Sequence, residues 1–268
     1  MNAKILTLTN TEHGSIELPA QFREPVRPDL IRRAVNAIAS NHRQPYGSHP
    51  EAGQRSSAKL SRRRRDFKAS YGMGISRVPR KSLSRQGTRF NFVGAVAPGT
   101  RKGRQAHPPK AWKQWSRSIN TKENRKAIRS AISATIDKIL VAKRGHHAPP
   151  SYPFVLDNSA EQITKTKELI KALHTLGLTA DLDRASTPKI QAGRATMRGR
   201  RFRTPRSVLL VVSTPCALTK SGHNVPGLDI TPVTSLNAAL LAPGGMPGRL
   251  TIFTQAAIEK LTKNNIFT

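Results

Sequence analysis

The segment that decides the fold reads Val208-Leu209-Leu210-Val211-Val212, and a shorter segment of the same kind, Phe154-Val155-Leu156, lies upstream. Both are continuous apolar runs, which are typical of strands buried on both faces of a parallel sheet. Further strands are predicted at residues 179–183, 228–233 and 250–253.

Between these strands, apolar residues recur three and four positions apart, which indicates helices. Asn120 followed by Glu123 is a candidate capping box, and Gly145 and Gly177 are typical helix ends. The expected helices cover residues 28–41, 120–145 and 159–177, the third capped by Ser159, and a last helix begins at a Thr254 cap. Strands that alternate with helices predict an α/β domain with a mostly parallel sheet flanked by helices.

The charge of the chain is strongly positive and unevenly distributed. Its 268 residues contain 46 Lys and Arg against 15 Asp and Glu, a formal net charge of +31. Residues 41–110 hold 17 Lys and Arg but only two acidic residues, Glu51 and Asp66, and show no helical or strand period. A charge density this high calls for a polyanionic partner, and nucleic acid is the class that we expect.

This basic segment interrupts the globular part of the sequence. We expect a globular α/β domain formed by residues 1–42 and 114–268, with residues 43–113 inserted as an extended basic loop. The loop is either a flexible, solvated insertion or an arm that becomes ordered between RNA phosphates. We favour the arm, because Arg is suited to phosphate and aromatic side chains such as Trp112 and Trp115 can stack on unpaired bases.

A second basic segment covers residues 187–206, with seven Lys and Arg and no acidic residue. Gly193 and Gly199 would let its backbone approach a ligand closely. The segment is either a mobile loop between two strands or a second RNA contact. We favour RNA contact, because seven like charges require compensation.

Several classes of protein are not expected. No apolar run approaches the roughly 20 residues of a membrane helix, and the N-terminus does not resemble a signal peptide. A single cysteine, Cys216, cannot form an internal disulfide or a Cys-based zinc site, and it is interpreted as a small apolar residue. We therefore expect a cytoplasmic protein with no membrane partner.

Catalytic chemistry is also not expected. Asp157, Asp181 and Asp183 fall near predicted strand ends, where a sheet of this kind could bind a small cofactor, but we interpret them as capping or turn residues. Gly72 and Gly74 lack the strand and the third glycine of a dinucleotide motif. His146 and His147 have no partner at metal-ligand spacing. The sequence predicts no cofactor, no metal and no small-molecule substrate.

Several longer strings occur in a characteristic order: Pro25-Val26-Arg27-Pro28-Asp29-Leu30-Ile31, Arg43-Gln44-Pro45-Tyr46-Gly47, Arg77-Val78-Pro79-Arg80, Ile190-Gln191-Ala192-Gly193-Arg194 and Leu241-Ala242-Pro243-Gly244-Gly245. Together they resemble the universal large-subunit ribosomal protein four family in its archaeal and eukaryotic branch. The absence of a long basic tail after the last string favours an archaeal origin.

The resemblance implies a structural role in the large ribosomal subunit rather than an enzymatic one. It implies an internal loop that penetrates large-subunit (23S-type) rRNA, supports subunit assembly and lines part of the peptide exit tunnel. The implied partners are this rRNA, neighbouring large-subunit ribosomal proteins, and the nascent peptide near the tunnel constriction. Arg77, Arg80 and Lys81 are the residues expected nearest the tunnel.

The residues expected to bind rRNA share a cationic or aromatic side chain in or beside the two basic segments. They are Arg43, Arg55, Arg62, Arg63, Arg64, Arg65, Lys68, Arg77, Arg80, Lys81, Arg85, Arg89, Arg101, Lys102, Arg104, Lys110, Trp112, Trp115, Arg117, Lys189, Arg194, Arg198, Arg200, Arg201 and Arg203. The alternative from another class is an RNA-modifying or nucleotide-binding α/β enzyme with a basic docking loop. A DNA-compacting protein is a third possibility.

Overall fold

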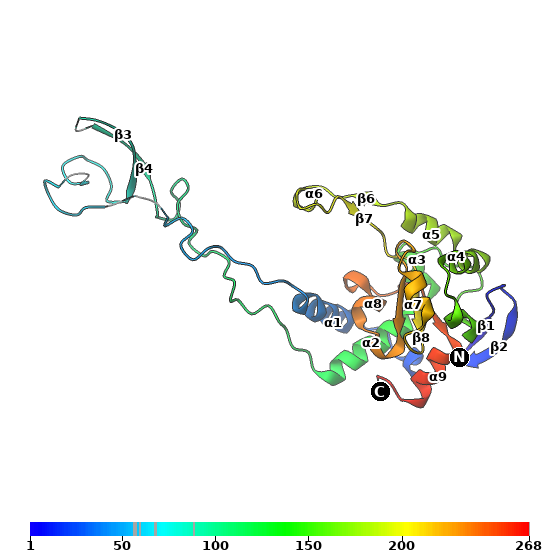
Figure 1. Cartoon of the computed structure of the whole chain (residues 1–268). Coiled ribbons are helices and arrows are strands. Elements are labelled where there is room, and N and C mark those ends of the chain that lie inside the picture. Colours follow the sequence, from blue (N-terminus) through cyan, green and yellow to red (C-terminus); the bar gives the residue numbers. More distant parts are fainter. Residues whose placement is uncertain (56–57, 59, 67–68, 88, 268) are drawn as a thin grey trace. The chain divides into compact units, whose positions relative to one another are not determined.

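The structure is a computed structural model, shown in Figure 1, that describes residues 1–55, 58, 60–66, 69–87 and 89–267. The chain forms two compact units. Residues 1–42 and 116–268 form the globular unit, and residues 43–115 form the second unit, which we call the arm.

The globular unit is built on a six-stranded sheet with the strand order β2-β1-β5-β10-β8-β9. The strands are β1 (Asn2–Leu6), β2 (Glu12–Glu17), β5 (Phe154–Leu156), β8 (Leu209–Val212), β9 (Asp229–Pro232) and β10 (Thr251–Thr254). All neighbouring pairs are parallel except β1 with β2, which are antiparallel. The predicted α/β class with a mostly parallel sheet is confirmed.

Helices cover both faces of this sheet. The α-helices of the globular unit are α1 (Pro28–Asn41), α2 (Thr121–Ile136), α3 (Lys138–Lys143), α4 (Thr166–Thr175), α5 (Thr179–Ser186), α6 (Arg194–Met197), α7 (Ala217–Gly222), α8 (Ala238–Leu241) and α9 (Gln255–Lys263). Short 3₁₀ turns lie between these elements: η1 (Ala20–Arg23), η2 (Asn158–Gln162), η3 (Val233–Ser235) and η4 (Pro243–Gly245).

The apolar run that decides the fold divides its side chains between two cores. Leu209 and Val211 pack with α1, α2, α8 and α9 on one face of the sheet. Leu210 and Val212 pack with α4, α5 and α7 on the other face. All four side chains are buried, so an uninterrupted apolar strand is what this position requires.

The predicted strand at residues 179–183 is wrong, because this segment is the start of α5. Gly177, with a φ of +81°, ends α4, and the chain turns at once into a new helix. Leu182 and Ala185 then pack inward three positions apart, and Asp181 is also buried. Polar and apolar residues alternate from Thr179 to Asp183, as in a strand, because the buried position 181 of this helix is occupied by an aspartate.

The predicted helix over residues 120–145 is broken at Asp137, whose backbone is extended and whose carboxylate caps α3 by accepting from the Ile139 amide at 2.8 Å. The proposed capping box is absent, because the Asn120 side chain makes no cap hydrogen bond. Glu123 instead forms an ion pair with Arg33 on α1 at 3.1 Å.

The predicted helix from residue 159 is also wrong at its start. Asp157, not Ser159, is the capping residue, and it begins the 3₁₀ turn η2. The regular helix α4 begins only at Thr166. The Thr254 cap is confirmed: its hydroxyl accepts from the Ala257 amide at 3.3 Å at the start of α9.

The arm contains regular structure that its composition did not predict. β3 (Arg80–Gln86) and β4 (Arg89–Gly94) form an antiparallel hairpin. Phe90 and Phe92 alternate along β4, so their rings lie on one face and stack with centroids 5.2 Å apart. The expectation that the segment lacks a strand period is therefore wrong for residues 80–86 and 89–94.

Candidate nucleic-acid interface

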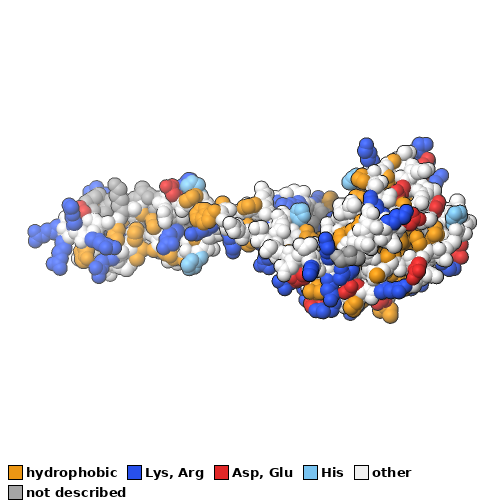
Figure 2. Space-filling model, turned by 90° about the horizontal axis from the view of Figure 1, so that it is seen from below, with side chains coloured by type: hydrophobic (Ala, Val, Ile, Leu, Met, Phe, Trp, Pro, Cys, Tyr) orange, Lys and Arg blue, Asp and Glu red, His pale blue; other side chains and the backbone are white. Residues whose placement is uncertain are grey.

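The charge of the arm is not neutralised from within. Residues 43–115 carry 18 Lys and Arg against Glu51 and Asp66. Glu51 pairs with Arg55 at 3.6 Å, and Asp66 accepts a hydrogen bond from the Ser61 hydroxyl. Figure 2 shows Lys and Arg side chains along the arm, with few acidic side chains among them. Two carboxylates cannot compensate 18 cations, so the arm presents a strong positive field.

Most of the cations predicted to bind RNA have side chains open to solvent. The exposed predicted residues of the arm are Arg43, Arg55, Arg62, Arg63, Arg64, Arg65, Arg77, Arg85, Arg89, Arg101, Lys102, Lys110 and Trp112. Arg80, Lys81, Arg104 and Trp115 are half-buried. Lys68 lies outside the described residues. The structure thus leaves most of the predicted set accessible to an external anion.

Aromatic stacking joins the two ends of the arm. Tyr46 and Trp115 stack with ring centroids 5.6 Å apart and planes inclined by 14°. The Arg43 guanidinium lies 3.8 Å from the Trp115 centroid, and the Lys113 ammonium lies 4.5 Å from it. Trp115 is therefore engaged within the protein, as a cation–π partner that holds together the outgoing limb of the arm, which starts at residue 43, and the returning limb, which ends at residue 115.

The limbs touch backbone to backbone beyond this stack. A Cβ atom at Gly47 would lie 2.3 Å from the Ala111 nitrogen, and one at Gly53 would lie 2.4 Å from the Arg104 Cα. The Ser48 amide also donates to the Pro109 carbonyl at 2.9 Å. Because only glycine permits such an approach, these two positions fix how the outgoing and returning limbs pair.

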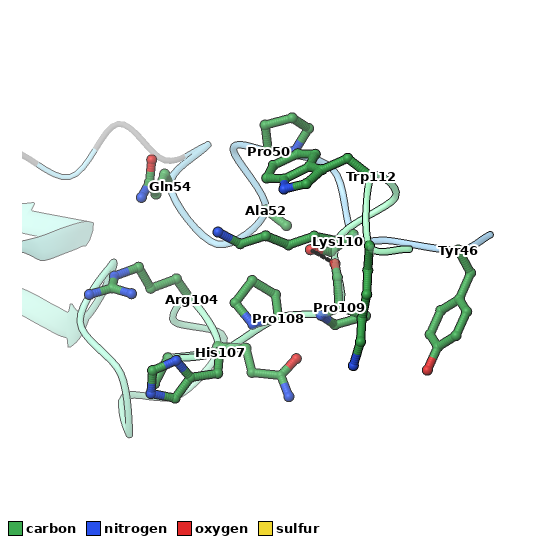
Figure 3. A pocket seen from close by; sticks show the side chains of 14 residues that line it. Tyr46, Pro50, Ala52, Gln54, Arg104, His107, Pro108, Pro109, Lys110 and Trp112 are labelled. Carbon is green, nitrogen blue, oxygen red and sulfur yellow. Dashed lines mark hydrogen bonds between the residues drawn. The ribbon is translucent and has the colours of Figure 1, made fainter. Parts of the chain in front are cut away.

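A groove of about 890 Å³ opens between the paired limbs, and we call it the limb groove (Figure 3). Trp112 and Pro50 lie at one side of it in this view, and His107 lies at the opposite side. Arg104, Lys110 and Lys113 supply cations, and the lining contains no carboxylate. An exposed aromatic ring beside fixed cations suits an unpaired base and its phosphate.

Trp112 is the most exposed aromatic surface of this groove. Its side chain is 70% exposed, and the Lys110 ammonium lies 5.1 Å from its ring centroid. The structure thus separates the two predicted tryptophans: Trp115 is occupied by protein groups, whereas Trp112 presents its ring to solvent. The groove-lining residues Tyr46, His107 and Lys113 were not in the predicted set, although His107 and Lys113 lie close to Trp112 and Trp115 in the sequence.

Around the β3–β4 hairpin, local hydrogen bonds orient the arginines. Arg77 donates to the Tyr71 hydroxyl at 3.1 Å, with its guanidinium 5.6 Å from that ring. Arg80 donates to the Val78 carbonyl at 3.0 Å and to the Ser76 hydroxyl at 2.9 Å. Lys81 follows on the same strand. Such bonds restrict the side chain before it binds, so less conformational entropy is lost when it binds phosphate.

The second basic segment forms a hairpin of β6 (Lys189–Ile190) and β7 (Phe202–Arg203) with α6 between them, which we call the basic hairpin. Figure 1 shows it projecting away from the sheet of its own unit. Its predicted residues are all exposed: Lys189, Arg194, Arg198, Arg200, Arg201 and Arg203. Gly193 and Gly199 both adopt positive φ, at +70° and +76°, and make the turns around α6.

Arg117, the remaining predicted residue, lies in the globular unit. Its amide donates to the Asn41 side chain at 2.8 Å, at the end of α1. It lines a shallow depression with Arg32 and Arg33 of α1.

Two acidic residues near the sheet have carboxylates with a structural contact, Asp157 and Glu161. The Asp157 carboxylate caps η2, as predicted, whereas Asp183 is exposed and offers its backbone carbonyl, not its carboxylate, to the Ser186 and Thr187 hydroxyls. At the carboxyl ends of β8 and β10, the Glu161 carboxylate accepts from Ser213 and from Thr254, both hydroxyls at 2.7 Å. Glu161 thus links the carboxyl ends of these two adjacent strands.

Asp181 belongs to a buried polar cluster. It accepts from the Ser207 hydroxyl at 2.6 Å, lies 3.2 Å from the His146 Nδ1, and pairs with Arg184 at 2.9 Å. Burial would raise the pKa of Asp181, but the hydrogen bonds of His146 and Ser207 outweigh it and lower the pKa to about 2. Every member thus has a partner within the cluster.

No group of three potential metal ligands gathers among the described residues, and no helix among them has the length and apolar character for a membrane crossing. Cys216 is half-buried at the start of α7, against the second core.

The sequence of residues 16–264 matches the family model described as ribosomal protein L4/L1 family. The chain belongs to this family. The resemblance found in the sequence is thereby confirmed. Proteins of this family are structural ribosomal proteins, so the family also confirms that the chain is not an enzyme.

Full-length relatives agree with the family assignment. The chain is 46% identical over 268 residues to the large ribosomal subunit protein uL4 of Nanoarchaeum equitans, with 100% of both chains covered. It is 42% identical over 265 residues to the protein of the same name in Archaeoglobus fulgidus, covering 97% of this chain and 98% of the relative. For Methanococcus vannielii the identity is 43%, with the same coverage. These relatives are archaeal.

Proposed function

We propose that this chain is a structural constituent of the large ribosomal subunit that binds large-subunit rRNA through the arm and the basic hairpin. The observation that carries the proposal is the limb groove with the uncompensated cations around it. Its flat aromatic surface, its cations and its lack of carboxylates suit single-stranded RNA segments better than any small neutral ligand. The assembled subunit is a cytoplasmic particle, with neighbouring ribosomal proteins as further partners.

In this role the arm neutralises phosphates where RNA helices pack closely. Its arginines displace condensed cations, so binding depends strongly on salt. If about half of the net charge of residues 41–110 meets phosphates, roughly seven contacts form, and the slope of log affinity against log salt is about −5 to −6. Sequence readout is not required, because shape and backbone carry the recognition.

The hairpin end of the arm is the part we assign to the peptide exit tunnel. This assignment rests on the family resemblance of the Arg77-Val78-Pro79-Arg80 string and on the exposed cations around it. Arg77, Arg80 and Lys81 would then face the nascent peptide near the tunnel constriction. A photocrosslinking amino acid at position 81 should capture nascent chains in translating ribosomes, whereas one at Lys167 on α4 should not.

The binding proposal is tested with the full chain and two polyanions. We expect tighter binding to transcribed large-subunit rRNA than to duplex DNA of equal length at equal salt, with the slope given above. The protein should also remain with large subunits of its own cells through a high-salt wash. Equal affinity for duplex DNA and for rRNA would favour a DNA-compacting protein. Release of the protein in the high-salt wash would contradict a structural role in the subunit.

A further inference from the structure

A cationic pocket of about 740 Å³ lies on the globular unit, on the sheet-proximal side of the basic hairpin. It lies where the end of α3, the helix α5, the strands of the basic hairpin and the turn η4 come together, and we call it the basic pocket. Six cations line it, and its lining contains no carboxylate. These cations are Lys143, Arg144, Arg184, Lys189, Arg203 and Arg206.

Two of the six cations are held in place by the protein. Arg144 donates to the Pro243 carbonyl at 2.7 Å and also to the Met246 carbonyl, so η4 fixes its position. Arg184 is held by the buried Asp181 at 2.9 Å and by the Arg206 carbonyl at 2.7 Å. The walls of the pocket are therefore preorganised, which lowers the entropy cost of binding an anion.

The charge of the pocket is not balanced by its surroundings. Arg184 pairs with Asp181, and Arg206 pairs with Asp229 at 2.8 Å. The other four cations make no ion pair with any carboxylate among the described residues. Burial, together with the nearby charges of Arg249 and Arg184, lowers the pKa of Arg144 below its ordinary value. An anion in the pocket would relieve this repulsion.

We propose that the basic pocket binds a phosphate group of an RNA backbone and anchors the globular unit to RNA independently of the arm. The inference rests on the proposed function and adds a binding site to it. RNA is favoured over an acidic protein because Lys189 and Arg203 belong both to the pocket and to the basic hairpin, which continues the cationic surface without an acidic residue. An RNA strand with one phosphate bound in the pocket could therefore place its next phosphates beside the cations of the basic hairpin.

The test removes three pocket cations that hold no other structure in place. Lys143, Lys189 and Arg203 are exposed and donate no side-chain hydrogen bond in the described structure. The pocket variant is K143Q/K189Q/R203Q in the full chain. The matched control K167Q/K171Q/K263Q removes the same charge from exposed positions on α4 and α9. Thermal unfolding of both variants verifies that they fold.

Binding to transcribed large-subunit rRNA is measured at several salt concentrations. We expect the salt slope of the pocket variant to be shallower by about one unit for each phosphate that the variant no longer neutralises, with the control close to the parent chain. Without RNA, we expect the pocket variant to have a melting temperature equal to or above that of the parent at low salt, because it removes like charges. A site with a purely structural role would instead lower it.

Two other outcomes overturn the proposal. If the pocket variant binds RNA with the parent's affinity and slope, the pocket serves an acidic protein or a free anion. Titration with inorganic phosphate separates those two: a melting-temperature increase in the parent but not in the pocket variant identifies a free-anion site. If the parent chain itself does not bind RNA, the proposed function fails, which is a different result from loss of the pocket's contribution alone.

Discussion

The Arg249 guanidinium lies 2.6 Å from the Asp229 carboxylate while its own side chain is only 1% exposed. It also donates to the Ser207 carbonyl and the Leu240 carbonyl, both at 3.0 Å. Ser207 precedes β8, Asp229 begins β9, and Arg249 precedes β10. One buried cation thus ties together the amino ends of three adjacent parallel strands.

This relationship predicts a large stability difference between two arginines that share one carboxylate. Replacing Arg249 by Met leaves buried carbonyls unpaired and should lower the free energy of unfolding by about 3–5 kcal/mol. Replacing Arg206, whose side chain is 58% exposed and which pairs with the same Asp229, should cost under about 1 kcal/mol. Urea unfolding of the two variants measures the difference, and equal losses would contradict the assignment.

A second prediction concerns acid. Burial lowers the pKa of His146 below its ordinary 6.5, against the opposing effect of Asp181. The unfolded chain then binds this proton more readily than the folded chain, so the free energy of unfolding falls as the pH drops below about 6.5. H146Q should flatten this part of the profile, whereas H147Q, at an exposed neighbouring position, should leave it unchanged. A pH profile that H146Q does not alter would show that another group is responsible.

Asp181 predicts a further loss at lower pH. Its pKa is lowered from 3.8 to about 2, so the stability it contributes is present above pH 3.8 and is lost as the pH falls towards 2. D181N should remove this loss and should also destabilise the chain at neutral pH, because the ion pair with Arg184 is broken. Thermal unfolding at a series of pH values measures both effects.

Trp112 should contribute directly to RNA affinity. Because its ring is open to solvent beside Lys110, W112A should weaken rRNA binding by about 1–3 kcal/mol at constant salt. W112F keeps an aromatic face and should retain most of the affinity. Filter binding or fluorescence anisotropy measures both variants. Equal losses for Ala and Phe would mean that the ring does not stack on a base.

Gly47 should be required for the shape of the limb groove. In G47A the new Cβ would meet the Ala111 backbone at 2.3 Å and force the limbs apart. We expect rRNA affinity to fall by about tenfold, or ~1.4 kcal/mol. The matched control is G94A, whose Cβ would meet only the Thr100 side chain at 3.1 Å. Similar affinities for G47A and G94A would show that limb pairing does not shape the binding surface.

Deleting residues 60–100 should leave the globular unit folded, because its two cores contain no residue of the deleted segment. Helical circular dichroism should be retained, while incorporation into large subunits should fall. A collapse of the helical signal would show that the arm is needed for folding of the globular unit.

The sequence predicted what repeats along the chain and missed elements whose residues do not follow a simple apolar pattern. Continuous apolar runs located β5 and β8, and the spacing of Ile31 and Val35 located α1. The strands β1 and β2 were not predicted, because Lys4 and Glu12 give them a polar appearance that an antiparallel edge tolerates. The helix break at Asp137 depends on a local side-chain cap that periodicity does not reveal.

The candidate interface was predicted as a composition and not as a shape. The cations and the tryptophans were identified from charge and aromatic content. The difference between Trp112, which is exposed, and Trp115, which stacks on Tyr46, was not predicted. It depends on Tyr46, which lies some 70 positions before Trp115 in the sequence. The basic pocket was missed for the same reason: Arg144 and Arg184 belong to segments outside both basic segments.

The glycine crossings of the arm also constrain how its length can evolve. A Cβ at Gly47 would contact Ala111 and one at Gly53 would contact Arg104, so the five residues 48–52 on the outgoing limb face the six residues 105–110 on the returning limb. Inserting or deleting one residue between these two glycine contacts would shift the outgoing limb against the returning limb. The cations beyond Gly53 would then change their positions relative to the opposite limb. Changes in length should therefore be tolerated beyond Gly53, around the β3–β4 hairpin, or where both limbs change by the same number of residues. We expect relatives to differ in length first around the hairpin.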